Sequence, residues 1–290
     1  MGGPRPFSFR TLRCKTVGMM NTVYFDTNVY SRLNGLIRSN DLGAYRALRS
    51  AVNSDRLRIF TSATVLEETN GAPRSERVSR FRLIRKLAKR KKIIRPHAEI
   101  LIDDVNSYAN NERFKSPFMA PFPRLRESWV GGISGLVEAA DETRVSNRAF
   151  RDRMREAYEA HIAPLAQRVI DNNEIPTFGE HYKANSTEFV RMVARPAKQL
   201  VACEAHGLQG LLEVPSVNAV VGAQLSINYA NTYLRRLQQQ GDRYDVQHVQ
   251  LAVALGTLVT GDVGLIRAVT RMNSRYVKAI SLAHLLRTLG

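Results

Sequence analysis

Two short apolar runs, one near each end of the chain, stop at an aspartate and lead into a helical pattern. Residues 23–25 are followed by Asp26, and residues 258–260 are followed by Gly261 and Asp262. A short apolar run that breaks at a turn before a helix is typical of a buried strand. Because the carboxyl ends of parallel strands share one edge of a sheet, we expect both aspartates to lie at that edge, where such folds bind ligands.

The same alternation of strand and helix patterns runs through both ends of the chain. Further strand patterns occur at residues 56–60, 93–94 and 276–280, and helical patterns at 44–52, 63–69, 74–92, 219–237, 245–255, 263–270 and 282–289. Strands that alternate with helices imply crossover connections between parallel strands. The sequence therefore predicts an α/β fold with a central, mainly parallel sheet.

The middle of the chain differs in character, because proline and glycine separate short helical pieces such as residues 148–159. We interpret residues 106–205 as a helical insertion in an α/β domain formed by residues 20–105 and 206–290. Residues 1–19 are basic, contain no acidic residue and lack an apolar signal core. We expect them to be a disordered leader and not a secretion signal.

The charge balance indicates a polyanionic partner. The 290 residues include 43 Lys and Arg against 26 Asp and Glu, which gives a formal net charge of +17. A protein this basic most often binds nucleic acid, although an anionic membrane surface or an acidic protein would also suit the charge. The two cysteines form no disulfide framework and no thiolate metal pattern, and this favours the cytoplasm.

Four acidic residues stand where a metal-dependent nuclease would use them, namely Asp26, Glu67, Asp245 and Asp262. Two end predicted strands, Glu67 lies early in a helix after a strand, and Asp245 opens another helix. Carboxylates are costly to bring together unless a cation neutralises them. Their oxygens suit Mg²⁺ or Mn²⁺, and such ions activate water for attack on a phosphodiester.

Each of these residues also has a simpler interpretation: Asp26 and Asp262 as turn residues, and Asp245, like Asn28, as a helix cap. Glu67 has an acidic neighbour, Glu68, and one of the two is expected to be a solvated helix residue; the spacing from Thr64 favours Glu67 as the site residue. His248 lies one helical turn after Asp245 and so on the same face. We interpret it as a supporting group and not as a metal ligand.

Taken in order, these fragments resemble the PIN domain family of metal-dependent ribonucleases. The resemblance rests on four short motifs, Asp26-Thr27-Asn28, Thr64-Val65-Leu66-Glu67, Asp245-Val246-Gln247-His248 and Thr260-Gly261-Asp262. It covers about residues 20–95 and 217–285. It implies a Rossmann-like α/β/α sandwich and RNA cleavage with Mg²⁺ or Mn²⁺. The family's acidic quartet maps onto the four acids, with Asn28, Thr260 and His248 in support. The long middle segment is a departure, since compact toxin members lack it.

A basic run within residues 74–92 is predicted to bind the RNA backbone, through Arg82, Arg85, Lys86, Lys89 and Arg90. The alternative is a solvated helix face, but such faces usually mix the two signs of charge. The sequence thus predicts an endoribonuclease that acts on single-stranded RNA. The alternatives are a nucleic-acid-binding or regulatory protein with little turnover, and a DNA structure-specific nuclease. An antitoxin-like protein partner and a homo-oligomer both remain open.

Overall fold

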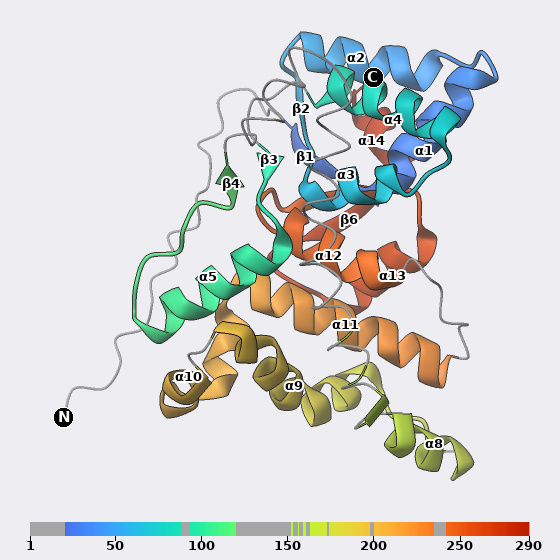
Figure 1. The fold of residues 1–290 in the computed structure, drawn as a ribbon. Coiled ribbons are helices and arrows are strands. Elements are labelled where there is room, and N and C mark those ends of the chain that lie inside the picture. Colours follow the sequence, from blue (N-terminus) through green and yellow to red (C-terminus); the bar gives the residue numbers. More distant parts are fainter. Residues whose placement is uncertain are drawn as a thin grey trace.

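A central sheet of four parallel strands organises the protein (Figure 1). The computed structural model describes residues 21–88, 93–119, 152, 156, 159–160, 163–172, 174–197, 200–234 and 242–289. Within these residues the strand order is β2 (Leu57–Phe60), β1 (Asn21–Phe25), β5 (Thr257–Thr260) and β6 (Lys278–Ser281). The parallel register pairs Asn21 with Leu57 and Tyr24 with Leu258. The prediction of an α/β fold with a parallel sheet is therefore confirmed.

Two groups of helices accompany the sheet (Figure 1). The first group, whose members contact one another, is α1 (Thr27–Arg38), α2 (Gly43–Asn53), α4 (Arg74–Leu87) and α14 (Leu282–Leu289). The second group is α11 (Pro215–Tyr233), α12 (Asp242–Ala252) and α13 (Val263–Met272). The short helix α3 (Ala63–Asn70) follows β2 and contacts α1, α4 and α12, so it joins the two groups at the carboxyl edge of the sheet.

A further layer of helices packs against α11. It contains α5 (His97–Ala109), α9 (Phe178–Ala194) and α10 (Leu200–His206), with α8 (Ala163–Asp171) near its end and two 3-10 turns, η1 (Arg195–Ala197) and η2 (Leu208–Glu213). Helix α11 is buried on almost every side, which explains why small and apolar residues occupy its whole circumference. Of the described residues within 106–205, those from 163 onward are mainly helical, whereas residues 111–119 are not and include a strand, and α5 crosses the expected boundary at residue 106.

A short antiparallel pair, β3 (Ile93–Ile94) and β4 (Phe118–Met119), extends the sheet beyond β2. An isolated parallel bridge between Ser62 and Ile94 connects the pair to the main sheet. The sequence patterns predict β3 but not β4: both have two residues, but β3 is a pair of β-branched isoleucines bounded by Pro96, whereas β4 lies in a proline-containing segment without a strand pattern.

Several element boundaries differ from the sequence prediction. Helix α12 begins at Asp242, so Asp245 lies within its first turn instead of opening it. Helix α11 begins at Pro215, because proline is well tolerated in the first helical turn. Helix α4 ends at Leu87, and residues 89–92 lie outside the described part, as do residues 1–20 and most of 148–159. No described helix is long and apolar enough to cross a membrane.

Candidate acidic site

The strand order reverses between β1 and β5, and two of the predicted aspartates lie at this point. The chain passes from β1 to β2 on one side and from β5 to β6 on the other, so a crevice is expected at the carboxyl ends of β1 and β5. Asp26 directly follows β1, and its backbone N–H donates to the Val259 carbonyl at 3.2 Å. Asp262 follows β5 after one glycine. The structure thus brings both residues to the same edge.

Both aspartates also cap helices. One carboxylate oxygen of Asp26, Oδ1, accepts a hydrogen bond from the Val29 N–H at 3.0 Å, and Asp262 Oδ1 accepts one from the Leu265 N–H at 2.9 Å. The sequence interpretation of both as turn residues, with helix caps at Asn28 and Asp245 instead, is therefore wrong, because Asp26 and Asp262 are the N-caps of α1 and α13. Capping leaves the second oxygen of each carboxylate for other contacts. The amino-terminal ends of α1 and α13, which carry partial positive charge, meet at the crevice.

Asp245 completes a group of mutually repelling aspartates. It is buried in the first turn of α12. Burial, followed by the negative charge of Asp262, raises its pKa from 3.8 to about 8; Asp242 and Asp26 add to this effect, and His248 opposes it. We call Asp26, Glu68, Asp245 and Asp262 the acidic cluster, since each is electrostatically coupled to another member.

Asp26 is fully buried, and one of its oxygens has no hydrogen-bond donor among the described residues. Burial raises the pKa of Asp26 to about 6, against the opposing influence of the His248 ring and the Thr260 hydroxyl. Its Oδ2 atom accepts no hydrogen bond from any residue that the structure describes. Burying a carboxylate oxygen without a hydrogen-bond donor costs free energy of folding, because burial removes the water that would otherwise donate to it.

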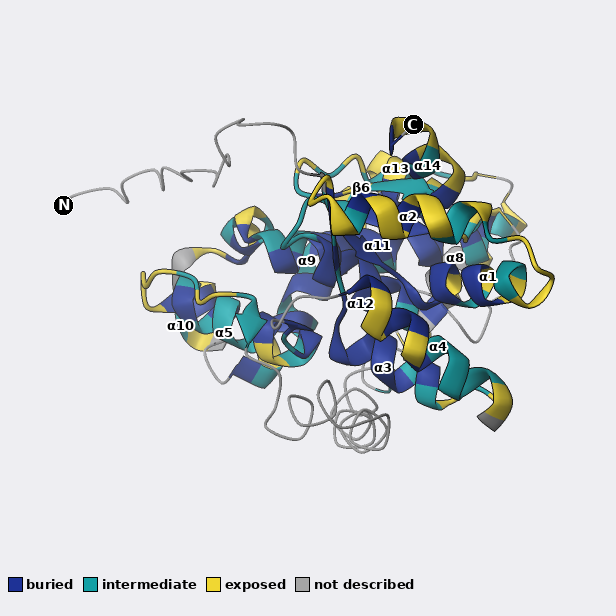
Figure 2. Cartoon of the chain, turned by 90° about the horizontal axis from the view of Figure 1, so that it is seen from above, coloured by how far each residue is buried: buried dark blue, intermediate teal, exposed yellow. Residues whose placement is uncertain are grey.

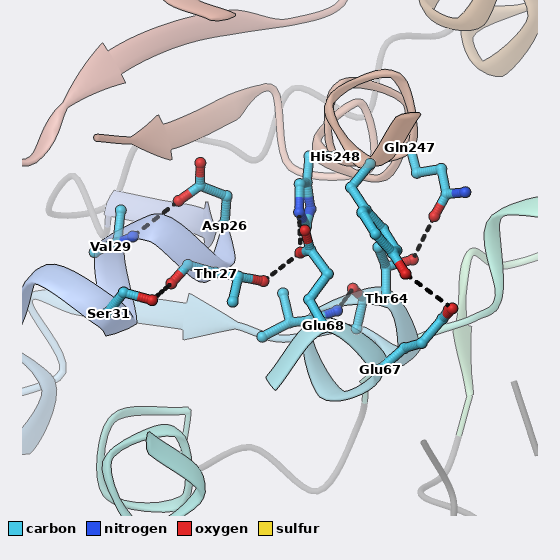
Figure 3. A network of polar contacts seen from close by, with 12 residues as sticks. Asp26, Thr27, Val29, Ser31, Thr64, Glu67, Glu68, Gln247 and His248 are labelled. Atoms are coloured by element: carbon cyan, nitrogen blue, oxygen red, sulfur yellow. Dashed lines mark hydrogen bonds and ion pairs between the residues drawn. The ribbon is translucent and has the colours of Figure 1, made fainter. Parts of the chain in front are cut away.

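The acid of α3 that joins the cluster is Glu68, whereas the sequence favours Glu67. Glu68 accepts hydrogen bonds from the Thr27 hydroxyl and, at 2.6 Å, from Nε2 of His248 (Figure 3). The Glu67 carboxylate is directed away from Asp26 and accepts a hydrogen bond from the Tyr244 hydroxyl at 3.2 Å. Neither glutamate is a solvated helix residue, since the Glu67 residue is 5% exposed and the Glu68 side chain 18%. That part of the sequence interpretation is wrong.

His248 connects the acidic cluster to the core through a chain of hydrogen bonds. Its Nδ1 atom lies 2.7 Å from the Tyr24 hydroxyl, which lies 2.8 Å from the Ser62 hydroxyl. Burial lowers the pKa of His248, but the Glu68 carboxylate, with Asp26 and Asp245, outweighs burial, and the pKa rises above its ordinary value. The imidazolium form therefore offsets part of the negative charge of the cluster. The supporting role predicted for His248 agrees with this arrangement.

The other predicted supporting residues lie at the rim of the crevice. Thr260 is buried, and its hydroxyl accepts a hydrogen bond from the Asp262 N–H at 2.9 Å. Asn28 is exposed in the first turn of α1, next to Gly261: a Cβ atom on that glycine would lie 3.7 Å from Asn28 Cβ. Asp242 is a buried acid near the site that the sequence patterns miss, because the predicted helix begins after it.

The predicted RNA-binding residues lie elsewhere on the protein. Arg82, Arg85 and Lys86 are exposed on α4, whereas Lys89 and Arg90 are outside the described residues. Leu87, at the end of α4, lines a hollow together with Leu57, the first residue of β2. The last turn of α4 therefore lies towards the amino edge of the sheet, whereas the acidic cluster lies at the carboxyl edge.

The cluster offers only oxygen ligands, as Mg²⁺ and Mn²⁺ prefer. Within the described residues, no three His, Cys, Asp or Glu side chains are grouped closely enough to hold a metal ion as they stand. The unpartnered Oδ2 atom of Asp26 and the raised pKa of Asp245 nevertheless fit a site for a divalent cation, which would remove both costs. Binding would require side chains to move, above all Glu68, which His248 holds.

Comparisons of the chain with protein-family models, with curated protein sequences and with solved structures gave no significant match.

Proposed function

We propose that this protein is a metal-dependent endoribonuclease with a PIN-like α/β/α fold. The observation that carries the proposal is the position of Asp26 and Asp262 after the two strands at the reversal point of a parallel sheet, with Asp245 electrostatically coupled to both. Burial and mutual repulsion raise the pKa of Asp26 and of Asp245. Carboxylates with strongly perturbed pKa values cluster at functional sites.

Each residue has a definite part in this proposal. Asp26, Asp245 and Asp262 would hold one or two Mg²⁺ or Mn²⁺ ions, and Glu68 would complete the set after release from His248. The bound metal would supply an activated water and would offset the negative charge that develops on the phosphodiester. The amino-terminal ends of α1 and α13 would attract the phosphate, and the exposed Asn28 amide would orient it.

A nucleic-acid-binding or regulatory protein with little turnover is the second candidate. One observation favours it: Glu68 is paired with His248, and the described carboxylates do not converge on one point. Against it, a binding protein gains nothing from burying mutually repelling carboxylates. A DNA structure-specific nuclease would use the same chemistry, so only the substrate separates it from the proposal.

Cleavage of labelled nucleic acid by the purified full chain tests the proposal. Single-stranded RNA and DNA are incubated separately with Mg²⁺, Mn²⁺ or EDTA. We expect RNA to be cut only with metal, and the activity to be lost in Asp26→Asn but retained in Asp171→Asn, a matched charge change at an exposed position of α8. Full activity in Asp26→Asn would overturn the proposed site. If only DNA is cleaved, the protein is a DNA nuclease and not a ribonuclease. If neither RNA nor DNA is cleaved, the regulatory protein is favoured.

A further inference from the structure

The outer face of α2 carries uncompensated positive charge. Arg46, Arg49, Ser50 and Asn53 are spaced by three or four residues, and all are exposed. With Ser54 they line a shallow hollow on the surface. Figure 2 shows this face of α2 exposed to solvent. Helix α2 contains no acidic residue, so no carboxylate on the helix itself offsets the two guanidinium groups.

This face continues onto the end of α4. A second hollow shares Asn53 with the first and is lined further along by Asp55, Leu57, Arg58 and Leu87, the last of which follows the exposed Lys86. Arg56 lies beside Leu57, and one of its N–H groups donates to the Leu289 carbonyl at 2.9 Å. We define the amino-edge basic surface as Arg46, Arg49 and Arg56 together with Arg85 and Lys86 in the last turn of α4; all are exposed, and none is ion-paired with a described residue.

The amino-edge basic surface and the acidic cluster lie at opposite edges of the sheet. Leu57 is the first residue of β2 and pairs with Asn21, the first residue of β1, whereas Asp26 follows the last residue of β1. Five residues of strand span roughly 15 Å. One nucleic acid molecule can therefore contact both edges, or two segments can occupy them independently.

We propose that the amino-edge basic surface binds the sugar–phosphate backbone of a base-paired RNA stem. Arginine matches phosphate geometry with two parallel N–H groups, and the exposed Ser50 lies with Arg46 and Arg49 in the lining of the hollow. The large apolar side chains that are exposed in the described residues are Ile175, Val201, Leu234 and Val263, and none belongs to this surface. Tyr45 of α2, which accepts a hydrogen bond from Arg49, is partly buried against the core. The surface therefore presents guanidinium groups for phosphate and no exposed large apolar side chain that would anchor a membrane or a protein partner.

The inference goes beyond the proposed cleavage and does not depend on it. If both hold, the stem is bound at one edge while an unpaired segment reaches the acidic cluster at the other. The substrate class is then an RNA with a stem next to a single-stranded region. Contacts of this kind read the shape and charge of the stem and not its sequence.

Binding measured in EDTA, where no metal-dependent cleavage occurs, tests the inference. Fluorescence anisotropy of a short labelled RNA duplex, and of one of its strands alone, is recorded between about 50 and 200 mM KCl. The variant carries Arg46→Gln, Arg49→Gln, Arg85→Gln and Lys86→Gln. Its matched control carries Arg113→Gln, Arg168→Gln, Lys183→Gln and Arg195→Gln, four exposed positions on other faces. Thermal unfolding of all the proteins verifies that they remain folded. Two double variants replace the quadruple variant if it does not fold.

We expect the variant, but not the control, to bind the duplex more weakly and with a smaller dependence on salt. Each lost duplex contact lowers the slope of log K against log salt by about 0.9. Equal losses in variant and control would show a general effect of net charge and would overturn the inference. A variant that loses affinity for the single strand but not for the duplex would also overturn the inference. So would a variant whose salt dependence of duplex binding is unchanged but which no longer binds vesicles of anionic lipid.

Discussion

Replacing Asp26 by asparagine should stabilise the metal-free protein. Asn is nearly as good a helix cap as Asp, so its side-chain oxygen can still accept the Val29 N–H that Asp26 Oδ1 accepts now. The substitution removes a buried charge that Glu68 and Asp245 repel. Its new amide N–H would replace Oδ2, the oxygen that lacks a donor among the described residues.

The size of the gain follows from the pKa of Asp26. An increase from 3.8 to about 6 costs the folded state roughly 3 kcal/mol once the carboxyl is ionised in the unfolded chain, at about 1.4 kcal/mol per pH unit. This is an upper value, because neighbouring side chains relax around the charge. At pH 4 the unfolded carboxyl is still half protonated, so little gain is expected there. The gain should increase between pH 4 and pH 6 and level off above pH 7.

Urea unfolding at pH 4.5 and pH 7.5 measures this difference directly. The matched control is Asp41→Asn, which changes the same charge at an exposed position where the carboxylate accepts the Gly43 N–H at 3.2 Å. The control should change the free energy of unfolding by about 0.5 kcal/mol or less. If Asp26→Asn destabilises the protein at pH 7.5, or if its effect does not depend on pH, then repulsion within the acidic cluster is not a cost of folding.

Three further results are expected. The free energy of unfolding of the metal-free protein should fall as pH rises from about 4 to about 8, and a free energy that rises with pH would contradict this. Ionisation of Asp26 and Asp245 costs stability because their pKa values are raised in the folded state, and the stabilising charge of His248 is lost over the upper part of this range. In the RNA cleavage assay Glu68→Gln should reduce the rate more than Glu67→Gln, and the reverse order would restore the acid favoured by the sequence. Mg²⁺ should raise the melting temperature of the wild type more than that of Asp26→Asn, since a ligand that binds only the folded state stabilises by mass action; equal shifts would exclude Asp26 as a ligand.

Most of the strands, and the aspartates at their ends, could be predicted because the signals that define them are local. Residues 23–25 are apolar and stop at Asp26, and residues 258–260 lead through Gly261 to Asp262. The sequence pattern places the helix caps wrongly, at Asn28 and Asp245, because it does not show that an aspartate that ends a strand also caps the next helix. The start of α12 could not be predicted, because no apolar residue marks its first turn. The antiparallel partner β4 could not be predicted either, since its pairing with β3 spans more than twenty residues of intervening chain.

The choice between Glu67 and Glu68 needed the three-dimensional structure. Helix α3 has eight residues, and Ala63 to Glu67 are all buried, so its burial shows no helical period that would assign a face to each glutamate. What decides is the position of His248, which comes from a helix about 180 residues later in the chain and contacts Glu68. A contact of that sequence separation leaves no trace in the local pattern.

Helix α11 makes the outer helical layer inseparable from the sheet. It packs against α12 and α13 on one side and against α9, α5 and η2 on others, and its Gly222 lies so close to Met272 that a Cβ atom there would come within 3.0 Å of the methionine Cε. A chain shortened to the sheet and its two helix groups would turn the buried surface of α11 that faces α9 into solvent-exposed apolar area. Such a truncation should aggregate instead of yielding a smaller working protein. Evolutionary loss of the outer helices would therefore require simultaneous polar replacements along α11.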